Sequence, residues 1–195
     1  SVSADGAMPV NNDSGVKYYH TRLLAAADRH DRPDWRYIAS RGEDGQRPAD
    51  PPSRVFPWAG QMISRSGWDA QAQWSFFDVG PYGVSHQHKD KLHLSIRAGD
   101  RHLLVDSGRC AYSGDLAVYR KDYGVRSRAH NVVLIDGCGQ LSDSKEAEVP
   151  HFRHRVAEGF DFAIGSFTAG FDADSHGAGA QPGHAARADA LARST

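Results

Sequence analysis

The chain has 195 residues, of which 24% are charged, and its formal net charge is -1 at neutral pH. This length suffices for one domain with a sizeable hydrophobic core. The near-zero charge gives no global reason to expect nucleic acid as a partner, and no apolar run approaches the roughly 20 residues that span a bilayer, so we expect no membrane insertion.

The N-terminal part of the chain carries a helical pattern. Asp13 and the serine after it resemble a helix N-cap, and the apolar residues that follow recur with helical spacing. Pro33 is expected to end this helix, and a second short helix is expected over residues 34–39. Residues 40–54 are rich in Gly, Pro, Asp and Arg and therefore indicate a connecting loop.

From residue 55 onward the pattern changes to strands and turns. Strands are expected over residues 73–79, 91–98, 102–106, 132–135 and 156–167. The second of these alternates between an apolar face, with Leu94 and Ile96, and a polar face, with His93 and Arg97. The sequence thus predicts a mainly β, antiparallel fold with a short helical segment at its N-terminal end.

The remaining stretches add two smaller expectations. The two cysteines, Cys110 and Cys138, are too few and too far apart for a disulfide framework, and we predict that both are small core residues. Residues from about 169 to the end are rich in Ala, Gly and His and poor in large apolar side chains. This tail is expected to be mobile because it cannot offset the entropy of ordering.

Polar residues at strand ends form the candidate site. His86 and His88 would share one face of an extended strand, because side chains alternate along a strand. Asp106 and His130 stand at the end and the start of apolar strands, where a buried polar group needs a partner. Two or three imidazoles with one carboxylate suit a borderline-soft divalent metal, zinc above all. Because the chain contains eleven histidines, a hydrogen-bonded polar cluster without metal is the simplest alternative.

Strand register raises an objection to this ligand set. A two-residue hairpin at Gly99–Asp100 would place Asp106 opposite His93. His88 would then lie roughly 16 Å further along the strand, unless the strand bulges or residues 87–91 fold back. His93 is therefore the alternative metal ligand.

Three motifs in succession carry a resemblance to a known family. They begin at Asp78 (Asp-Val-Gly-Pro-Tyr-Gly-Val-Ser-His-Gln-His-Lys-Asp-Lys-Leu), at Leu103 (Leu-Leu-Val-Asp-Ser-Gly) and at Ala129 (Ala-His-Asn-Val-Val-Leu-Ile-Asp-Gly), with Gln140 following. Over roughly residues 8–171 the chain resembles the heparinase II/III family. These polysaccharide lyases split uronate-containing chains such as heparan sulfate or alginate.

The resemblance implies a domain organisation. Residues 1–45 would be the end of a helical α/α toroid and its linker, residues 46–171 an antiparallel β-sandwich, and residues 172–195 a disordered tail. The family's sandwich continues with further strands, so the sandwich is expected to be incomplete in this chain.

Roles for individual residues follow from the resemblance alone. His88, Asp106 and His130 match the positions that bind a structural metal, usually zinc, in several members, and His86 matches a histidine that faces the substrate cleft. Side chains that would contact the sugar are Tyr112, Tyr119, Tyr123 and Arg126. For these four, a surface or packing role is the alternative.

The reaction of such lyases explains the residue types. Eliminative cleavage removes the C5 proton of a uronate and expels the 4-linked oxygen, while hydrogen bonds or positive charge neutralise the neighbouring carboxylate. The imidazole of His86 suits proton transfer near neutral pH. In the family, a catalytic tyrosine and the group that neutralises the carboxylate come from the toroid. We therefore expect the chain to be an incomplete lyase that does not turn over substrate by itself.

The expected partner is an acidic polysaccharide or oligosaccharide, and the family implies a periplasmic or secreted location, although no signal peptide is present. Two alternatives remain. One is a non-catalytic carbohydrate-binding β-sandwich that keeps the metal as a stabilising clip. The other is a cupin-type metal barrel, but His93 stands where the cupin glutamate would be, and the second cupin motif is missing.

Overall fold

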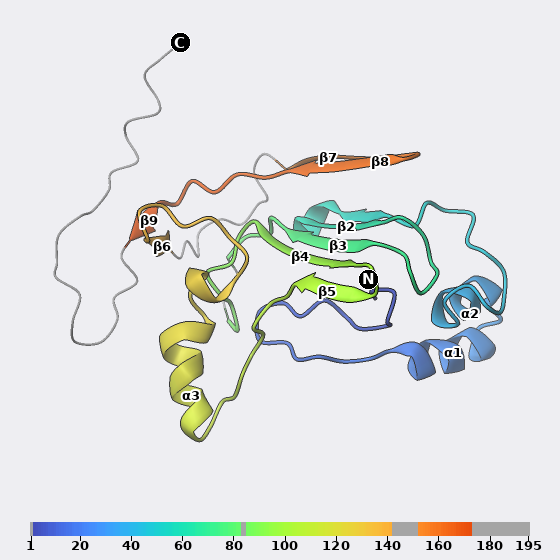
Figure 1. Ribbon diagram of the computed structural model, residues 1–195, viewed down its shortest axis with the longest axis horizontal. Coiled ribbons are helices and arrows are strands. Elements are labelled where there is room, and N and C mark those ends of the chain that lie inside the picture. Colours follow the sequence, from blue (N-terminus) through green and yellow to red (C-terminus); the bar gives the residue numbers. More distant parts are fainter. Residues whose placement is uncertain (1, 83–84, 142–151, 173–195) are drawn as a thin grey trace, which may run out of the picture.

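The protein is described by a computed structural model that covers residues 2–82, 85–141 and 152–172 (Figure 1). A five-stranded antiparallel sheet with the strand order β1-β2-β3-β4-β5 forms its centre. The strands are β1 (Arg54–Phe56), β2 (Gln61–Arg65), β3 (Trp74–Asp78), β4 (His93–Ala98) and β5 (Arg101–Leu104). The mainly antiparallel β fold predicted from the sequence is therefore confirmed.

Two further strand pairs and a few short helices complete the described chain. The pairs are β6 (Gly139–Gln140) with β9 (Phe171–Asp172), and β7 (Arg153–Ala157) with β8 (Phe160–Ile164). The helices are α1 (His20–Arg29), α2 (Pro33–Ala39), α3 (Asp115–Tyr119), and the single turns η1 (Pro57–Ala59), η2 (Arg120–Gly124) and η3 (Ser127–Ala129). None of the described helices is long and apolar enough to cross a membrane.

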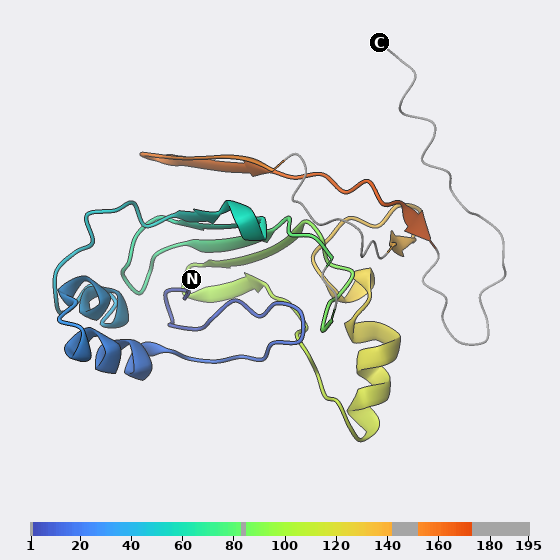
Figure 2. The ribbon, with the colours of Figure 1, turned by 180° about the vertical axis from the view of Figure 1, so that it is seen from behind.

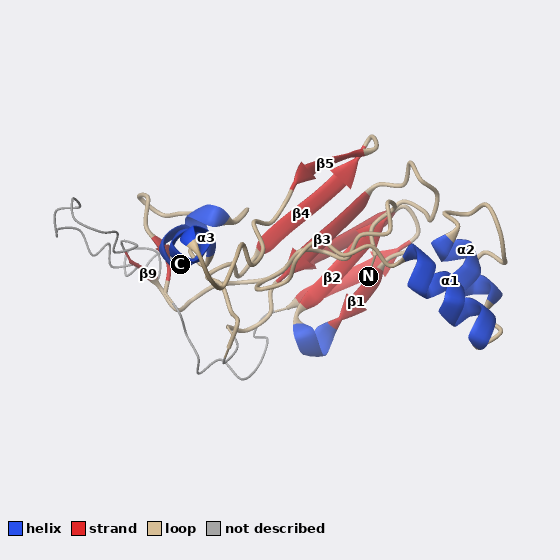
Figure 3. Ribbon diagram, turned by 90° about the horizontal axis from the view of Figure 1, so that it is seen from below, coloured by secondary structure: helices blue, strands red, loops and turns tan. Residues whose placement is uncertain are grey.

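The sheet is covered on both faces. The β7–β8 hairpin runs over one face, and the segment before α1 runs along the other, as the front and back views show (Figures 1 and 2). Asp161 of β8 ties the hairpin to the sheet, because its carboxylate accepts hydrogen bonds from the hydroxyls of Ser53 and Ser64. Seen from below, α1 and α2 lie at one end of the sheet and α3 at the other (Figure 3).

The apolar core is small and lies on the face turned toward the N-terminal segment. Ile63 and Phe76 are cross-strand partners, and the ring of Trp74 stacks near that of Phe76 with centroids 6.4 Å apart. The same face of β4 carries polar residues, His93 and Arg97 among them, and these are buried whereas the apolar alternates are only half-buried. The alternation predicted for this strand is present, but its polar face is the better covered one. The N-terminal segment supplies partners there.

Two expected strands differ from the structure. Residues 132–135 form no strand, and Val133 is 70% exposed, because no described strand pairs with this β-branched run beyond a single bridge from Ile135 to Cys138. Residues 156–167 are not one strand either, because the chain reverses at Gly159 (φ 72°) and β7 pairs with β8. Of the two predicted core cysteines, Cys138 is buried but Cys110 is exposed.

The N-terminal helix begins later than its sequence pattern suggests. α1 starts at His20, with Tyr19 at the N-cap position, so the predicted cap at Asp13 is wrong. The second short helix is confirmed as α2. Asp13 instead lies in a turn that the Ser14 amide closes by donating to the Asn11 carbonyl, and its carboxylate is held by His86 and Arg120. The tail expected to be mobile lies outside the described residues from residue 173 onward.

Candidate metal centre and active site

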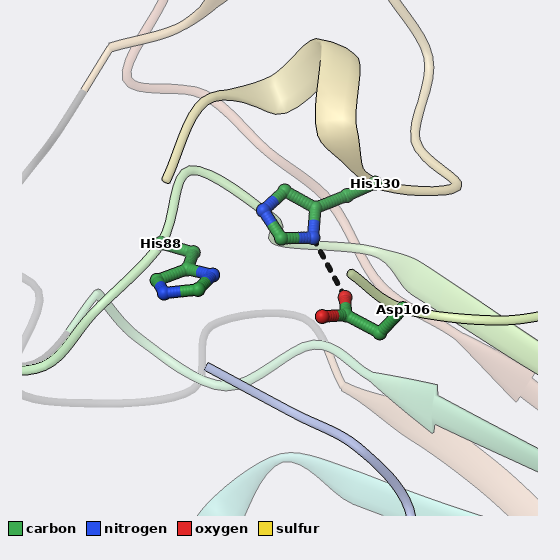
Figure 4. Close-up of side chains that lie close together, drawn as sticks. All are labelled: His88, Asp106 and His130. Atoms are coloured by element: carbon green, nitrogen blue, oxygen red, sulfur yellow. Dashed lines mark hydrogen bonds and ion pairs between the residues drawn. The ribbon is translucent and has the colours of Figure 1, made fainter. Parts of the chain in front are cut away.

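The three predicted metal ligands meet at the end of the sheet where β4 begins and β5 ends (Figure 4). His88 comes from the loop before β4, Asp106 follows β5, and His130 follows η3. One ligand atom from each lies within 4.8 Å of the others, and His130 Nδ1 is 2.6 Å from Asp106 Oδ2. All three side chains are 0% exposed. The structure thus gathers the predicted His/Asp/His set, while its role as a metal site stays a prediction.

The register left a bulge and a fold-back of the preceding loop as alternatives, and both are present. The hairpin pairs Ala98 with Arg101 as expected, but a bulge shifts the register so that Ile96 pairs with Leu104. The loop before β4 also turns back sharply, with Leu92 at φ 69° and the His93 amide donating to the Asp90 carbonyl at 2.9 Å. These two distortions bring His88 close to Asp106. β5 itself is exposed rather than buried, although the carboxylate after it is buried.

Side chains that mimic backbone pairing hold the loop that carries His88. Gln140 accepts a hydrogen bond from the Lys91 amide at 3.0 Å and donates to the Lys91 carbonyl at 2.7 Å. Ser127 donates to the Lys89 carbonyl at 2.7 Å and accepts from the Gln140 amide at 2.9 Å. Both residues are buried. This loop is therefore held in place without belonging to a strand.

Asn131 fixes the other side of the site. Its side-chain amide donates to the carbonyls of Leu94 (3.1 Å) and Val105 (2.9 Å), and so bridges β4 to the residue before Asp106. This bridge explains why an asparagine follows His130: it holds the two chain segments together beside the bulge.

The electrostatics of the cluster favour an ionised carboxylate beside imidazole. Burial would raise the pKa of Asp106, but the hydrogen bond and charge of His130 hold it below its usual range. For His130, burial lowers the pKa, but the bond to Asp106 outweighs this and raises it. Burial lowers the pKa of His88. This lowering favours the neutral form of His88, which is the form of an imidazole that can bind a metal.

The unused nitrogens test whether a metal fits. His88 Nδ1 and His130 Nε2 are both buried and have no hydrogen-bond partner among the described residues. Such orphaned buried nitrogens are rare in proteins and are satisfied when a metal is bound. Two imidazoles and a carboxylate form a donor set that suits zinc. The residues therefore fit a metal ion.

His93, the alternative ligand, is placed differently. Its Nδ1 lies 3.4 Å from Asp106 Oδ2, and its side chain is 0% exposed. However, its Nδ1 accepts a hydrogen bond from the backbone N–H of Asn131 (3.3 Å), and its Nε2 pairs with the Ser95 hydroxyl at 2.8 Å. Burial lowers the pKa of His93 to about 4, so the ring is neutral. Because both of its nitrogens are engaged, His93 fits a supporting role better than a ligand role.

His86 lies apart from the buried cluster. It adopts a left-handed conformation (φ 58°), its side chain is 63% exposed, and it does not share a strand face with His88 as the spacing predicted. The chain forms a loop at this point, so period-two alternation does not apply. The Tyr112 hydroxyl lies 2.9 Å from His86 Nδ1, with the two rings edge to face at 5.9 Å. An exposed imidazole beside a phenol can exchange protons with a bound molecule.

Asp13, which the sequence pattern assigned to a helix cap, is the central residue missed. Its side chain is 4% exposed, and its carboxylate contacts His86, His88, Tyr112 and Arg120. Burial would raise its pKa, but the hydrogen bonds from Arg120, His88, His86 and Tyr112 hold the pKa of Asp13 well below its usual range. The only signal in the sequence was the polar run Asn11-Asn12-Asp13, which also fits a cap.

The other predicted sugar-contacting residues form a separate group. Tyr119, at the end of α3, and Tyr123 have ring centroids 5.1 Å apart, and the Tyr123 hydroxyl donates to the Arg128 carbonyl at 3.1 Å. Arg126 is half-buried in the following turn. The structure brings Tyr112 to His86, whereas the sugar-binding role of all four residues stays a prediction.

Comparison with known proteins finds similar sequences and similar folds. A family model described as heparinase II/III-like, C-terminal, matches residues 48–176. A heparin-sulfate lyase from Pedobacter heparinus is 28% identical over 102 residues, covering 52% of this chain and 15% of the relative.

Solved structures show the same fold. The crystal structure of heparan sulfate lyase HepC from Pedobacter heparinus matches 83% of this chain and 25% of its own length, at 22% identity and a TM-score of 0.70. A heparinase III structure matches 69% of this chain and 22% of its own length, at 21% identity and a TM-score of 0.61. The chain thus spans a quarter or less of each relative's length.

Proposed function

Because the chain belongs to the heparinase II/III-like family, whose model matches residues 48–176, we propose that it forms the metal-bearing part of a polysaccharide lyase. The proposed reaction is β-elimination within a uronate-containing polysaccharide, of the heparan sulfate or alginate type. The observation that carries the proposal is the exposed His86, which is paired with Tyr112 and is linked through Asp13 to His88 of the buried His/Asp/His cluster.

In this proposal His86 performs the proton transfer. Its ring is exposed, so a sugar can reach it, and a neutral imidazole can take the C5 proton of a uronate. Tyr112 has a raised pKa, because partial desolvation and its bond to Asp13 disfavour the phenolate. Tyr112 therefore keeps its proton at neutral pH and can transfer that proton to the expelled 4-linked oxygen, which then leaves as a hydroxyl group.

His88, Asp106 and His130 would hold the metal, with zinc as the proposed ion. A bound zinc ion would act as a structural clip for the loops that carry these residues. The three side chains are fully buried, whereas His86 is exposed. This separation supports a division in which the cluster keeps the site in shape and His86 meets the substrate.

The surroundings of Tyr112 suit an acidic sugar chain. The guanidinium groups of Arg109 and Arg120 lie 5.1 and 5.2 Å from the centroid of its ring. Positive charge beside the reacting group would stabilise the uronate carboxylate as negative charge develops on it. Further sugar contacts are proposed for Tyr119, Tyr123 and Arg126.

A periplasmic or secreted location is proposed on the basis of the family alone.

A chimaeric enzyme tests this function. Residues 8–171 of this chain would replace the matching region of the Pedobacter heparan sulfate lyase, and the absorbance of newly formed unsaturated uronate would be followed on heparan sulfate and on alginate. We expect turnover that falls about 10²- to 10⁴-fold in His86→Ala. His102→Ala, an exposed histidine bound to Asp5, is the matched control and should keep the activity.

The assay distinguishes a lyase from a non-catalytic carbohydrate-binding module. A folded, zinc-loaded chimaera that is as inactive as its His86→Ala variant would contradict the lyase proposal. Retention of the original chain on immobilised heparan sulfate or alginate, together with that inactivity, would instead support a non-catalytic carbohydrate-binding module.

A further inference from the structure

One carboxylate serves both members of the His-x-His pair. Asp13 Oδ2 is 2.8 Å from His86 Nδ1, and Asp13 Oδ1 is 3.0 Å from His88 Nε2. The two histidines therefore approach the same carboxylate through different ring nitrogens. Neither this shared contact nor its asymmetry is visible in the spacing of the motif.

The position of Asp13 is built into the fold. Asn12, directly before it, accepts a hydrogen bond from the His88 amide at 2.9 Å, and Asn11 donates to Asp78 at 2.7 Å. Three consecutive side chains of this turn thus attach it to the sheet and to the loop that carries His88. On the far side of the carboxylate, Arg120 donates from Nε (2.9 Å) and from Nη2 (2.7 Å) to Oδ1.

An ionised carboxylate can only accept hydrogen bonds, so each ring nitrogen that contacts Asp13 must carry its proton. A neutral imidazole has a single N–H. His88 is therefore protonated at Nε2 and His86 at Nδ1. The nitrogens left with a lone pair are Nδ1 of His88, which is buried without a hydrogen-bond partner in the described chain, and Nε2 of His86, on a side chain that is 63% exposed.

We propose that Asp13 is a positioning residue that sets opposite tautomers in His86 and His88. It thereby leaves the lone pair of one ring for a metal and that of the other for a proton. The uses of the two lone pairs rest on the proposed function, whereas the tautomers themselves do not. Carboxylates that fix the tautomer of a metal-bound or catalytic histidine are established devices, but here a single carboxylate does both.

Nitrogen NMR of the metal-free chain tests the proposal directly. Two-bond ¹⁵N–¹H correlation spectra at a pH of about 8.5, where an ordinary imidazole is neutral, distinguish Nδ1–H from Nε2–H rings. The signals of the two histidines would be assigned by their loss in His86→Ala and His88→Ala. We expect His88 as the Nε2–H tautomer and His86 as the Nδ1–H tautomer. The same tautomer in both rings would overturn the proposal.

The variant Asp13→Asn extends the test. Its amide retains one accepting oxygen and gains a donor, so at least one of the two rings should change tautomer. Zinc affinity, measured by competition with a chromophoric chelator, should fall about 10- to 100-fold. Asp5→Asn, which also removes a carboxylate bonded to a histidine, is the control and should leave both tautomers and the zinc affinity unchanged.

The two proposals fail separately. Unchanged tautomers in a folded Asp13→Asn variant would overturn the positioning role, and if this variant does not fold, the wild-type spectra still decide. An inactive chimaera, together with the expected tautomers in the metal-free chain, would support the positioning role of Asp13 and contradict the lyase proposal.

Discussion

His88 and His93 are two buried imidazoles beside the same carboxylate, and their hydrogen bonds tell them apart. Both ring nitrogens of His93 have hydrogen-bond partners, namely the Ser95 hydroxyl and the backbone N–H of Asn131. Nδ1 of His88 has no hydrogen-bond partner among the described residues. Distance to Asp106 alone would not have separated them. The inventory of donors and acceptors favours His88 over His93 for the proposed ligand position.

Metal content of single variants tests this assignment. We expect one zinc ion per chain in the wild type, and its loss in His88→Ala and in His130→Ala, because each removes one of three ligands. His93→Gln should keep the zinc, since glutamine can still donate to Ser95. Elemental analysis of the purified proteins measures this, and zinc lost from His93→Gln but kept in His88→Ala would exchange the two roles.

Asp5 provides a pH-dependent contribution to stability away from the cluster. Burial would raise its pKa, but hydrogen bonds from Ser3, His102 and the Ala7 amide lower it to about 2. The unfolded state then binds more protons than the folded state between pH 4 and 2. The contribution of Asp5 is therefore complete above pH 4 and is lost as the pH falls toward 2.

Urea unfolding of the wild type and of Asp5→Asn at several pH values measures this contribution. The wild type should be the more stable protein at pH 6, and the difference should shrink steadily below pH 4. A difference that stays constant down to pH 2.5 would contradict the lowered pKa of Asp5.

At the scale of elements, the N-terminal segment before α1 packs closely against the turn after β5. Gly108 in that turn has φ 61°, and a Cβ atom built on it would lie 2.6 Å from Val10 Cγ1 and 2.7 Å from the Ser14 carbonyl oxygen. Arg109 also donates its amide to the same carbonyl at 3.0 Å. The segment that carries Asp13 is thus positioned by a glycine that no other residue could replace without movement.

Gly108→Ala is therefore expected to destabilise the chain by about 1–3 kcal/mol more than the cost of its left-handed backbone alone. Gly99→Ala is the matched control, since Gly99 has a similar φ of 56° and a Cβ there would meet nothing within 4 Å. Chemical denaturation of both variants gives the difference. Equal losses of stability would show that the close packing at Gly108 is not rigid.

The sequence predicted those parts of the structure that depend on local pattern or on motif succession. The His88/Asp106/His130 set, the hairpin at Gly99 and the antiparallel sheet belong to this class. The bulge in β4–β5 was identified as one of two conditions for the site, but alternation alone could not place it.

The missed features depend on contacts between distant segments. Asp13 meets Arg120 across 107 positions, and no periodicity reports such a contact. The run at residues 132–135 has high β-propensity, but a strand also needs a neighbour to pair with, and no described strand supplies a ladder. In each case tertiary context decided against the local preference.

Over the whole molecule, the proposed zinc ion would join the loop before β4, the turn after β5 and the residue after η3. Binding to the folded state alone stabilises it by about 4 kcal/mol at a thousand-fold excess of metal over the dissociation constant. Zinc should accordingly raise the melting temperature of the wild type, and a chelator should reverse the rise. His130→Ala should show no zinc-dependent shift in the same calorimetric experiment, and an equal shift in that variant would place the metal elsewhere.

The carboxylate of Asp13 also has a consequence for how the protein is made. Its partners follow it by 73 to 107 positions, so every one of these contacts closes a long loop. Contacts between residues so far apart in the sequence form late in folding, because closing a long loop costs less entropy once the local hairpins have shortened it. During synthesis from the N-terminus, Asp13 cannot pair with Arg120 until residue 120 has left the ribosome. The hydrogen-bond network around Asp13 and the two histidines is thus completed only after residue 120, which is later than the synthesis of all five strands of the central sheet.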